Sequence, residues 1–314
     1  MSNQLLLGFD IGGTKSSVVV GDGNGNALAH EEFPTSTAES TIARLIALGG
    51  RLCGGERPAA CGIACGGPLS SRQGLILSPP NLPGWDRVPI VEMVQTALHV
   101  PTSLENDANA AAVAEWRWGL KCQVDNVIYL TCGTGMGAGI ILGGRLVRGP
   151  TDTAGEIGHV RLMPMGPVGY YKAGSVEGLT SGRALGELAK LRLQEPHEPS
   201  HLDKIPLDQI TGKEVGMEAL EGDAFALRVV REQAEYLGRT CAILIDILNP
   251  QRISLGSSAH RLGNLLLDGV RDAARREALP AAYQACIIDK AVLGDQIQDL
   301  AALAIAREAA EAIA

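Results

Sequence analysis

The sequence predicts an α/β protein built from two related lobes, and three observations support this. The chain has 314 residues, more than a single small core needs, so two lobes of about 120–190 residues are expected. Apolar segments of strand length alternate with helical segments along the chain. An arrangement of strand, glycine-rich turn and strand occurs near the start and again after residue 126. Such internal similarity indicates a duplicated unit.

The first half of the chain predicts alternating strands and helices that follow one glycine turn. Residues 5–9 are apolar and predict a strand, residues 10–15 a turn, and residues 17–20 a second strand. Glycine and asparagine at 21–25 then favour a hairpin, because both residues accept positive φ. The later segments predict strands over 59–64 and 102–105 and helices over 41–48, 90–99 and 108–118.

Near residue 126 the pattern restarts. Residues 127–131 and 140–142 predict strands on either side of a second glycine-rich turn, and residues 150–182 are irregular. Three long helical stretches are expected after them, over 217–247, 259–277 and 297–314. We therefore expect a first lobe of residues 1–118, with a C-terminal helix over 298–314 packing back on it, and a second lobe of residues 119–297.

Composition and charge exclude two classes of partner. The net charge is −8 and no long basic run is present, whereas binding to nucleic acid needs clustered lysine and arginine. No apolar run approaches the length of a membrane span, and no secretory signal is recognisable. The seven cysteines are scattered and odd in number, as is typical of a reducing compartment. We expect a cytoplasmic protein.

The two glycine turns are candidate phosphate sites. Successive backbone N–H groups can converge on phosphate oxygens where no Cβ blocks their approach. The donors are Gly12, Gly13, Thr14 and Lys15 in the first turn, and Gly133, Thr134, Gly135 and Gly137 in the second. Either turn alone is equally consistent with an ordinary hairpin.

Two common nucleotide-binding motifs are excluded. A Walker A sequence is absent. The run Gly133-x-Gly135-x-x-Ala138 formally matches the dinucleotide fingerprint, but that motif requires a helix directly after the turn. Residues 140–142 predict a strand instead.

Two aspartates follow predicted strands and are candidates for chemistry. Asp10 lies beside the first glycine turn, where a carboxylate can hold Mg²⁺ through water; its alternative role is a turn cap. Asp107 lies between a strand and a helix, and phosphoryl transfer to an alcohol needs a carboxylate that accepts the hydroxyl proton. Its alternative role is a helix N-cap.

Three further polar residues are weaker candidates for binding a polyol. Glu156 and His159 lie three residues apart in a glycine-rich segment, so both side chains can point the same way. Residues of this kind are more often simply solvated, and Glu177 is weaker still.

Taken in order, these motifs resemble the ROK family (repressors, open reading frames, kinases). The resemblance runs from residue 5 to about 260. The motifs that carry it are Asp10-Ile-Gly-Gly-Thr-Lys15, Gly66-Gly67-Pro68-Leu69, Asn81-Leu-Pro-Gly-Trp85, Glu105-Asn106-Asp107-Ala108-Asn109, Gly133-Thr-Gly-Met-Gly137 and Gly155-Glu156-Ile-Gly-His159. It implies an actin-like ATPase fold of two ribonuclease-H-like lobes closing over a central cleft, with ATP, Mg²⁺ and a sugar acceptor.

The resemblance also implies roles for individual residues. It assigns the catalytic base to Asp107 and water-mediated Mg²⁺ binding to Asp10. It assigns sugar contacts to Gly67, Asn81, Asn106, Glu156, His159 and Glu177. Both glycine turns become phosphate loops. The adenosine-side motif of the family, Leu-Gly-Gly-Gly, is here Leu255-Gly256-Ser257-Ser258, so Gly256 and Ser257 are expected at the nucleotide.

The chain departs from the family pattern at a metal site. Zinc-bearing members place three closely spaced cysteines after the Gly-His pair, and the histidine completes the tetrahedral set. Residues 160–182 contain no cysteine, and Ser175 stands where the last one would be. We therefore expect no zinc site, and other packing must fix Glu177.

The resemblance favours a glucokinase-type kinase acting on the C6 hydroxyl, as a homodimer. Alternatives are kinases of N-acetylglucosamine, N-acetylmannosamine or fructose, and polyphosphate as donor. A transcriptional regulator of this family would carry an N-terminal helix-turn-helix, for which a strand starting at residue 5 leaves no room. A non-catalytic sugar-binding protein is a further alternative.

Overall fold

The computed structural model describes residues 4–313 and contains two five-stranded sheets, each with a hydrophobic core of its own. Residues 1–3 and 314 lie outside the described part. They are the ends of the predicted first lobe (1–118) and of the predicted C-terminal helix (298–314). The chain divides into two units. Unit 1 takes in the residues up to Gln123, Leu146–Ala154 and those from Asp295 onward; unit 2 comprises Val124–Arg145 and Gly155–Gly294.

The sheet of unit 1 has the strand order β3-β2-β1-β4-β7. Its strands are β1 (Leu5–Ile11), β2 (Lys15–Asp22), β3 (Ala27–Pro34), β4 (Ala60–Cys65) and β7 (Thr102–Asn106). The first two form the hairpin expected around the glycine turn, and β1, β4 and β7 run parallel. The carboxyl ends of these three parallel strands therefore meet at one edge of the sheet, where ligands of open α/β sheets bind.

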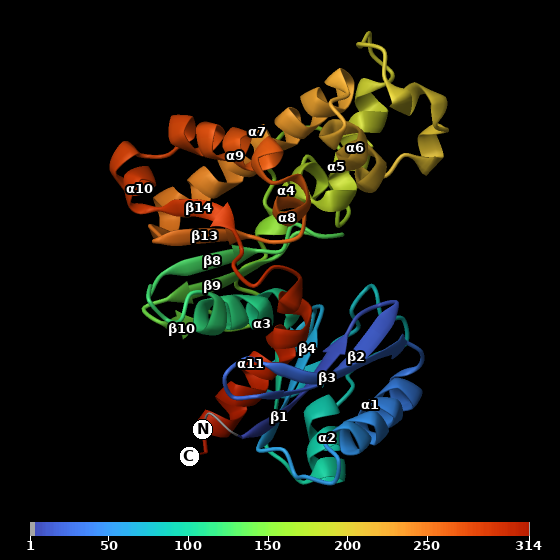
Figure 1. Ribbon diagram of the computed structural model, residues 1–314, viewed down its shortest axis with the longest axis vertical. Helices are drawn as coiled ribbons and strands as arrows, with labels where there is room; N and C mark the ends of the chain where they lie inside the picture. The colour runs from blue at the N-terminus through green and yellow to red at the C-terminus, as the bar shows by residue number, and fades with distance from the viewer. Residues whose placement is uncertain (1–3, 314) are drawn as a thin grey trace. The chain divides into compact units, whose positions relative to one another are not determined.

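Four helices cover this sheet, namely α1 (Ala38–Leu52), α2 (Ile90–Leu98), α3 (Asp107–Ala114) and α11 (Ile297–Glu311). Figure 1 shows α11 lying along the sheet beside β1 and β4. The close approach depends on small residues, because a Cβ on Gly62 would lie 2.1 Å from the carbonyl oxygen of Ala302 in α11. The short strands β5 (Leu69–Ser70) and β6 (Leu75–Ile76) form a small hairpin between β4 and α2.

The sheet of unit 2 has the order β10-β9-β8-β13-β14. Its strands are β8 (Val127–Leu130), β9 (Ala138–Leu142), β10 (Arg145–Leu146), β13 (Arg252–Leu255) and β14 (Ile287–Lys290). A strand hairpin again opens the sheet, since β8 pairs antiparallel with β9 and parallel with β13. The helices are α4 (Val176–Thr180), α5 (Gly182–Arg192), α6 (Gly212–Leu220), α7 (Ala224–Leu248), α8 (Ser258–Leu262), α9 (Asn264–Glu277) and α10 (Pro280–Ala285).

Two of the long predicted helices are interrupted. The stretch 217–247 is not one helix, because α6 ends before Gly222, whose φ is +91°, and Asp223 caps α7 by accepting a hydrogen bond from the N–H of Ala226. The stretch 259–277 is divided into α8 and α9 at Gly263, with φ +53°. Glycine accepts these conformations without the penalty a Cβ would add.

Two further differences concern unit 1. The helix expected over 108–118 changes after Ala114 into a π-helical turn over Glu115–Gly119. The segment Leu146–Ala154, which the sequence analysis placed in the second lobe, packs with unit 1. None of the helices within residues 4–313 is long and apolar enough to cross a bilayer. Over the same residues all seven cysteines are free thiols, six of them buried.

Candidate active site

The parallel strands of unit 1 bring the two candidate aspartates to the same edge. Asp10 pairs in register with Ala64 of β4, and Ala64 pairs with Glu105 of β7. Asp107 follows two residues after Glu105, as the first residue of α3. Residues almost 100 positions apart in the sequence thus stand at the ends of two parallel strands that are separated only by β4.

Burial raises the pKa of both carboxyl groups, and the charge of Asp107 adds to the rise at Asp10. Burial, and next the negative charge of Asp107, raise the pKa of Asp10 to about 7. Desolvation also raises the pKa of Asp107, while the N–H of Ala108 and the side chain of Asn106 oppose that rise. An acid whose ionised form is disfavoured by burial and by a like charge is suited to a nearby cation.

Asn106 is the residue that caps α3. Its Oδ1 accepts hydrogen bonds from the N–H groups of Ala108, at 3.0 Å, and Asn109, at 3.3 Å. The carboxylate of Asp107 accepts from the adjacent N–H of Ala108, at 2.8 Å. The alternative role of Asp107 as the N-cap is therefore filled by its neighbour. The amide nitrogen of Asn106 faces Gly67, where a Cβ would approach within 3.7 Å of it.

The end of β7 is held by an ion pair that the sequence analysis did not identify. Glu105 is 1% exposed, and its carboxylate accepts from Asn106 N–H at 2.9 Å, from Asn109 Nδ2 at 2.9 Å and from Ser71 Oγ at 3.3 Å. Arg148 Nε lies 2.6 Å from its other oxygen. A buried carboxylate with these partners fixes the backbone immediately before Asp107.

The first glycine turn is folded against the segment that contains Asn81. Gly12 N–H donates to the carbonyl of Lys15 at 3.0 Å, which closes the turn. A Cβ on Gly13 would lie 2.6 Å from the carbonyl oxygen of Asn81, so only glycine permits this approach. Thr14 is exposed, and Lys15 Nζ pairs with Glu32 at 2.9 Å. Unit 1 thus gathers the predicted residues Asp10, Gly12, Gly13, Thr14, Lys15, Gly67, Asn81, Asn106 and Asp107.

The second glycine turn, in unit 2, is tied to its surroundings by backbone contacts. Gly137 N–H donates to Thr131 Oγ1 at 3.0 Å, and the carbonyl of Gly133 accepts from Gly182 N–H at 2.6 Å. Ser258 Oγ donates to the carbonyl of Cys132 at 2.8 Å. This serine belongs to the Leu255-Gly256-Ser257-Ser258 segment, so it joins the two loops expected at the nucleotide.

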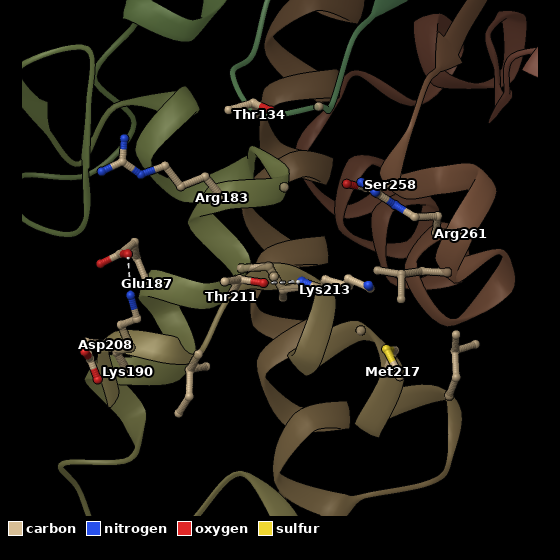
Figure 2. A pocket seen from close by; sticks show the side chains of 18 residues that line it. Thr134, Arg183, Glu187, Lys190, Asp208, Thr211, Lys213, Met217, Ser258 and Arg261 are labelled. Atoms are coloured by element: carbon tan, nitrogen blue, oxygen red, sulfur yellow. Dashed lines mark hydrogen bonds and ion pairs between the residues drawn. The ribbon is translucent and has the colours of Figure 1, made fainter. Parts of the chain in front are cut away.

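A cavity of about 610 Å³ opens beside this turn. Thr134 and Ser258 lie toward one end and Met217 toward the other (Figure 2). The apolar part of its wall consists of Leu185, Ile210, Met217, Leu220 and Leu262. This size falls within the range of about 300–1,000 Å³ typical of small-molecule sites. The glycine turn at one end offers backbone N–H groups that can bind phosphate, and the apolar wall at the other end can contact a base. This combination suits a nucleotide.

The cavity also carries excess positive charge. Lys190 is paired with Glu187 at 2.9 Å. Arg183, Lys213 and Arg261 also line it, and none of them forms an ion pair with a described residue (Figure 2). Asp208 also lines the cavity, so four basic side chains face two acidic ones, and this excess favours an anionic ligand.

The weaker candidates Glu156, His159 and Glu177 are brought next to the second glycine turn. Glu156 immediately precedes the 3₁₀ helix Ile157–His159, and a Cβ on Gly158 would lie 2.3 Å from the carbonyl of Met136. Glu177 Oε2 accepts from Met136 N–H at 3.1 Å. Unit 2 thus gathers the predicted residues Gly133, Thr134, Gly135, Gly137, Glu156, His159, Glu177, Gly256 and Ser257.

Comparison with known proteins identifies the family. The model of the ROK family matches residues 6–309.

This chain belongs to the ROK family.

Among its relatives, a glucokinase of Streptomyces coelicolor is 36% identical over 281 residues, which cover 87% of each protein. A xylose repressor of Caldicellulosiruptor bescii is 31% identical over 245 residues, 78% of this chain and 61% of that protein. The crystal structure of a ROK family glucokinase from Streptomyces griseus in complex with glucose and AMPPNP aligns with a TM-score of 0.81 at 34% identity, covering 97% of this chain and 99% of that one. The predicted actin-like ATPase fold is confirmed.

The residues near His159 differ from the zinc site that the family resemblance implies for zinc-bearing members. The ring of His159 packs edge-on against that of Tyr170, with 4.4 Å between ring centroids. Within residues 4–313, the one group of three His, Cys, Asp or Glu side chains close enough to share an ion is His201, Glu218 and Glu221, and it does not include His159. The residues around His159 therefore do not fit a tetrahedral zinc ion.

Proposed function

We propose that this ROK protein transfers the γ-phosphoryl group of ATP to a hexose hydroxyl, the C6 hydroxyl of glucose being the expected acceptor, with Asp107 as the general base. The observation that carries the proposal is that Asp107 is not the cap of its helix. Its neighbour Asn106 supplies the cap of α3, so the helix does not depend on the carboxylate of Asp107 for that purpose. A carboxylate in that position can accept the proton of an attacking hydroxyl.

The cavity of unit 2 supports a nucleotide as donor over polyphosphate. A chain of phosphates needs cations and N–H groups but has no use for an apolar wall, which a purine base can fill. The expected roles are that Gly133, Thr134, Gly135 and Gly137 receive the phosphates and that Gly256 and Ser257 flank the adenosine. In unit 1, the turn of Gly12, Gly13, Thr14 and Lys15 is expected to contact the transferred group.

Asp10 suits the magnesium ion that phosphoryl transfer uses. Burial and the charge of Asp107 raise its pKa, so the ionised carboxylate would be stabilised by a cation. Water molecules bound to Mg²⁺ would donate hydrogen bonds to the carboxylate of Asp10, and the ion would keep much of its hydration shell. The bound ion would also neutralise phosphate charge. Asp107 keeps its own role in this arrangement, which is to orient the sugar hydroxyl and take its proton.

The acceptor side of the proposal rests on the polar residues that the family resemblance assigns to the sugar. Gly67, Asn81 and Asn106 of unit 1, and Glu156, His159 and Glu177 of unit 2, are expected to hold the sugar hydroxyls. The similarity to a ROK glucokinase whose structure contains glucose and AMPPNP supports this choice of substrates. We also propose that the protein is a cytoplasmic homodimer.

A coupled assay of ADP release tests the proposal. The purified chain would be given ATP, Mg²⁺ and, separately, glucose, fructose, mannose, N-acetylglucosamine and N-acetylmannosamine, with polyphosphate replacing ATP in a parallel series. We expect glucose to give the largest kcat/KM with ATP. Preference for an N-acetylhexosamine would change the proposed acceptor sugar but leave the proposed reaction, phosphoryl transfer from ATP, unchanged. Sugar binding without ADP release from any member of the panel would instead support a non-catalytic regulator, the function class of the related xylose repressor.

A further inference from the structure

The loop that carries Glu177 lacks the cysteines of zinc-bearing relatives, yet it is closely held. We propose that Lys172 and Ser175 replace the metal in this chain, forming a metal-free clasp over residues 159–178 that positions Glu177 and His159. The proposal deepens the proposed function, since it assumes that these two residues contact the sugar. The clasp itself is a statement about structure and can be tested separately.

Backbone hydrogen bonds first close residues 160–176 into a compact hairpin. Val176 N–H donates to the carbonyl of Val160 at 2.8 Å, at its base. The carbonyl of Gly174 accepts from the N–H groups of Leu162, at 2.9 Å, and Met163, at 3.0 Å. These bonds define the hairpin, but none of them reaches His159 or Glu177.

Lys172 connects the hairpin to His159. Its Nζ donates to the carbonyl oxygen of His159 at 2.6 Å, from a half-buried side chain. No carboxylate within the described residues forms an ion pair with Lys172, so the backbone carbonyl is its principal acceptor. The ring of Tyr170 packs on that of His159 from the same hairpin. A charge-assisted bond and a ring contact thus fix a histidine that zinc would hold through its nitrogen.

Ser175 connects the hairpin to Glu177, from the position where the last cysteine would stand. Its side chain is fully buried; Oγ donates to the carbonyl of Gly169 at 3.2 Å and accepts from Gly178 N–H at 3.1 Å. It is therefore both a tie within the hairpin and the N-cap of α4. A hydroxyl performs these two tasks at once because it donates and accepts, which a metal-bound thiolate does not.

These contacts fix the position of Glu177, the second residue of α4. The tip of the hairpin lies directly on it, since a Cβ on Gly169 would come within 2.8 Å of the Cβ of Glu177 and 2.4 Å of the N–H nitrogen of Gly178. With its Cβ covered, the carboxylate of Glu177 reaches Met136 N–H of the second glycine turn. The clasp thereby couples the sugar-binding loop to the phosphate loop without an ion.

Amide hydrogen exchange of the full chain, with no substrate added, tests the clasp. Treatment of the wild-type protein with a zinc chelator is expected to leave the exchange of residues 159–178 unchanged. Lys172→Met and Ser175→Ala are each expected to raise exchange in this segment about tenfold, the loss associated with one strong hydrogen bond. Lys172→Arg, which keeps a donor cation, is expected to retain most of the protection.

Matched controls are available in the same unit. Lys204→Met removes an exposed lysine, and Ser200→Ala removes another serine that caps a helix; neither is expected to change exchange over 159–178. Faster exchange in the wild type after chelation, or wild-type exchange in both Lys172→Met and Ser175→Ala, would overturn the proposal.

Kinetics separate the clasp from the proposed function. If the protein phosphorylates glucose, Lys172→Met is expected to raise the KM for glucose about tenfold, while kcat and the KM for ATP change less than about threefold. If no sugar in the panel is phosphorylated, the proposed function fails, and the exchange measurements still decide the clasp.

Discussion

Asp10 and Asp107 stand at the same edge of the unit 1 sheet, at the ends of β1 and β7, but differ in their surroundings. Asp10 is half-buried at the end of β1, and burial together with Asp107 raises its pKa to about 7. Asp107 begins a helix whose cap is supplied by Asn106. The first acid is therefore suited to a cation and the second to a proton, which is the division of roles that phosphoryl transfer to an alcohol requires.

The raised pKa of Asp10 predicts a pH-dependent cost to stability in the absence of metal. A carboxyl whose pKa is raised on folding favours the folded state when protonated. Its contribution is full below the unfolded value of 3.8 and is lost as the pH rises through about 7. Asp10→Asn imitates the neutral form at every pH. Thermal melts without Mg²⁺ should give this variant a Tm roughly 3 °C or more above wild type at pH 8. This difference should shrink to about a third at pH 5, because the loss begins above 3.8.

The wild-type protein with and without Mg²⁺ is the control for this prediction. Added Mg²⁺ at pH 8 should raise the Tm of the wild type more than that of Asp10→Asn, because only the former can hold the ion. An equal difference in Tm between the two proteins at pH 5 and pH 8 would show that the carboxyl of Asp10 does not titrate as described.

At the scale of elements, the end of β7 depends on the ion pair of Glu105 with Arg148. Arg148 lies in the segment Leu146–Ala154, which leads directly into Gly155 and the proposed sugar ligand Glu156. Arg148→Met should destabilise the protein by about 3 kcal/mol, since it leaves a buried carboxylate without a counter-charge. It should also lower kcat, because the backbone before Asp107 is released. Urea denaturation and the coupled assay measure the two effects.

A second substitution distinguishes loss of the pair from loss of packing. Glu105→Gln combined with Arg148→Met should recover much of the lost stability, because the buried charge is then absent. Arg87→Met, which removes an exposed arginine of the same unit, should change stability by less than about 0.5 kcal/mol. Additive losses in the double variant would contradict a direct interaction between Glu105 and Arg148.

Ser258 links two elements of the nucleotide site, and its loss should affect the nucleotide alone. Ser258→Ala removes the 2.8 Å bond from α8 to the carbonyl of Cys132. Loss of one neutral hydrogen bond corresponds to about a fivefold rise in the KM for ATP. The KM for glucose, measured in the same coupled assay, should stay within about twofold of wild type. A larger effect on glucose than on ATP would show that Ser258 supports another site.

At the scale of the whole molecule, the two units have separate cores, and tryptophan fluorescence reports on only one of them. All three tryptophans, Trp85, Trp116 and Trp118, belong to unit 1, whereas the proposed nucleotide cavity is lined by unit 2. ADP without Mg²⁺ should therefore raise the urea midpoint followed by far-UV circular dichroism more than the midpoint followed by tryptophan fluorescence. Identical midpoints that shift together would show that the units unfold as one.

The glycine turns and the α/β architecture could be predicted because their signals are local. The turns over 10–15 and 133–137 need small residues at adjacent positions, and apolar strands flank both. The division of residues 217–247 into two helices was missed, although Gly222 and Asp223 are a recognisable stop and cap. The helical periodicity of apolar residues in α7 is long, so it favoured one continuous helix over a break at these two residues.

The residues that position the site could not be predicted, because their partners are distant in sequence or belong to the backbone. Glu105 and Arg148 are 43 positions apart, and neither side chain alone indicates a partner. Lys172 binds a carbonyl oxygen, which every residue possesses, so sequence carries no signal for it. The absence of cysteines over 160–182 indicated that something must replace zinc, but only the folded loop shows Lys172 and Ser175 in that position.

The most direct test of the account is the turnover of Asp107→Asn in the presence of ATP, Mg²⁺ and glucose. Asparagine keeps the shape of the side chain but cannot accept the hydroxyl proton, so kcat should fall at least about a thousandfold. Glucose binding, measured by calorimetry, should stay within about threefold of wild type. Asp125→Asn, at an exposed aspartate of unit 2, should turn over normally. Wild-type turnover in Asp107→Asn would contradict the assignment of Asp107 as the base.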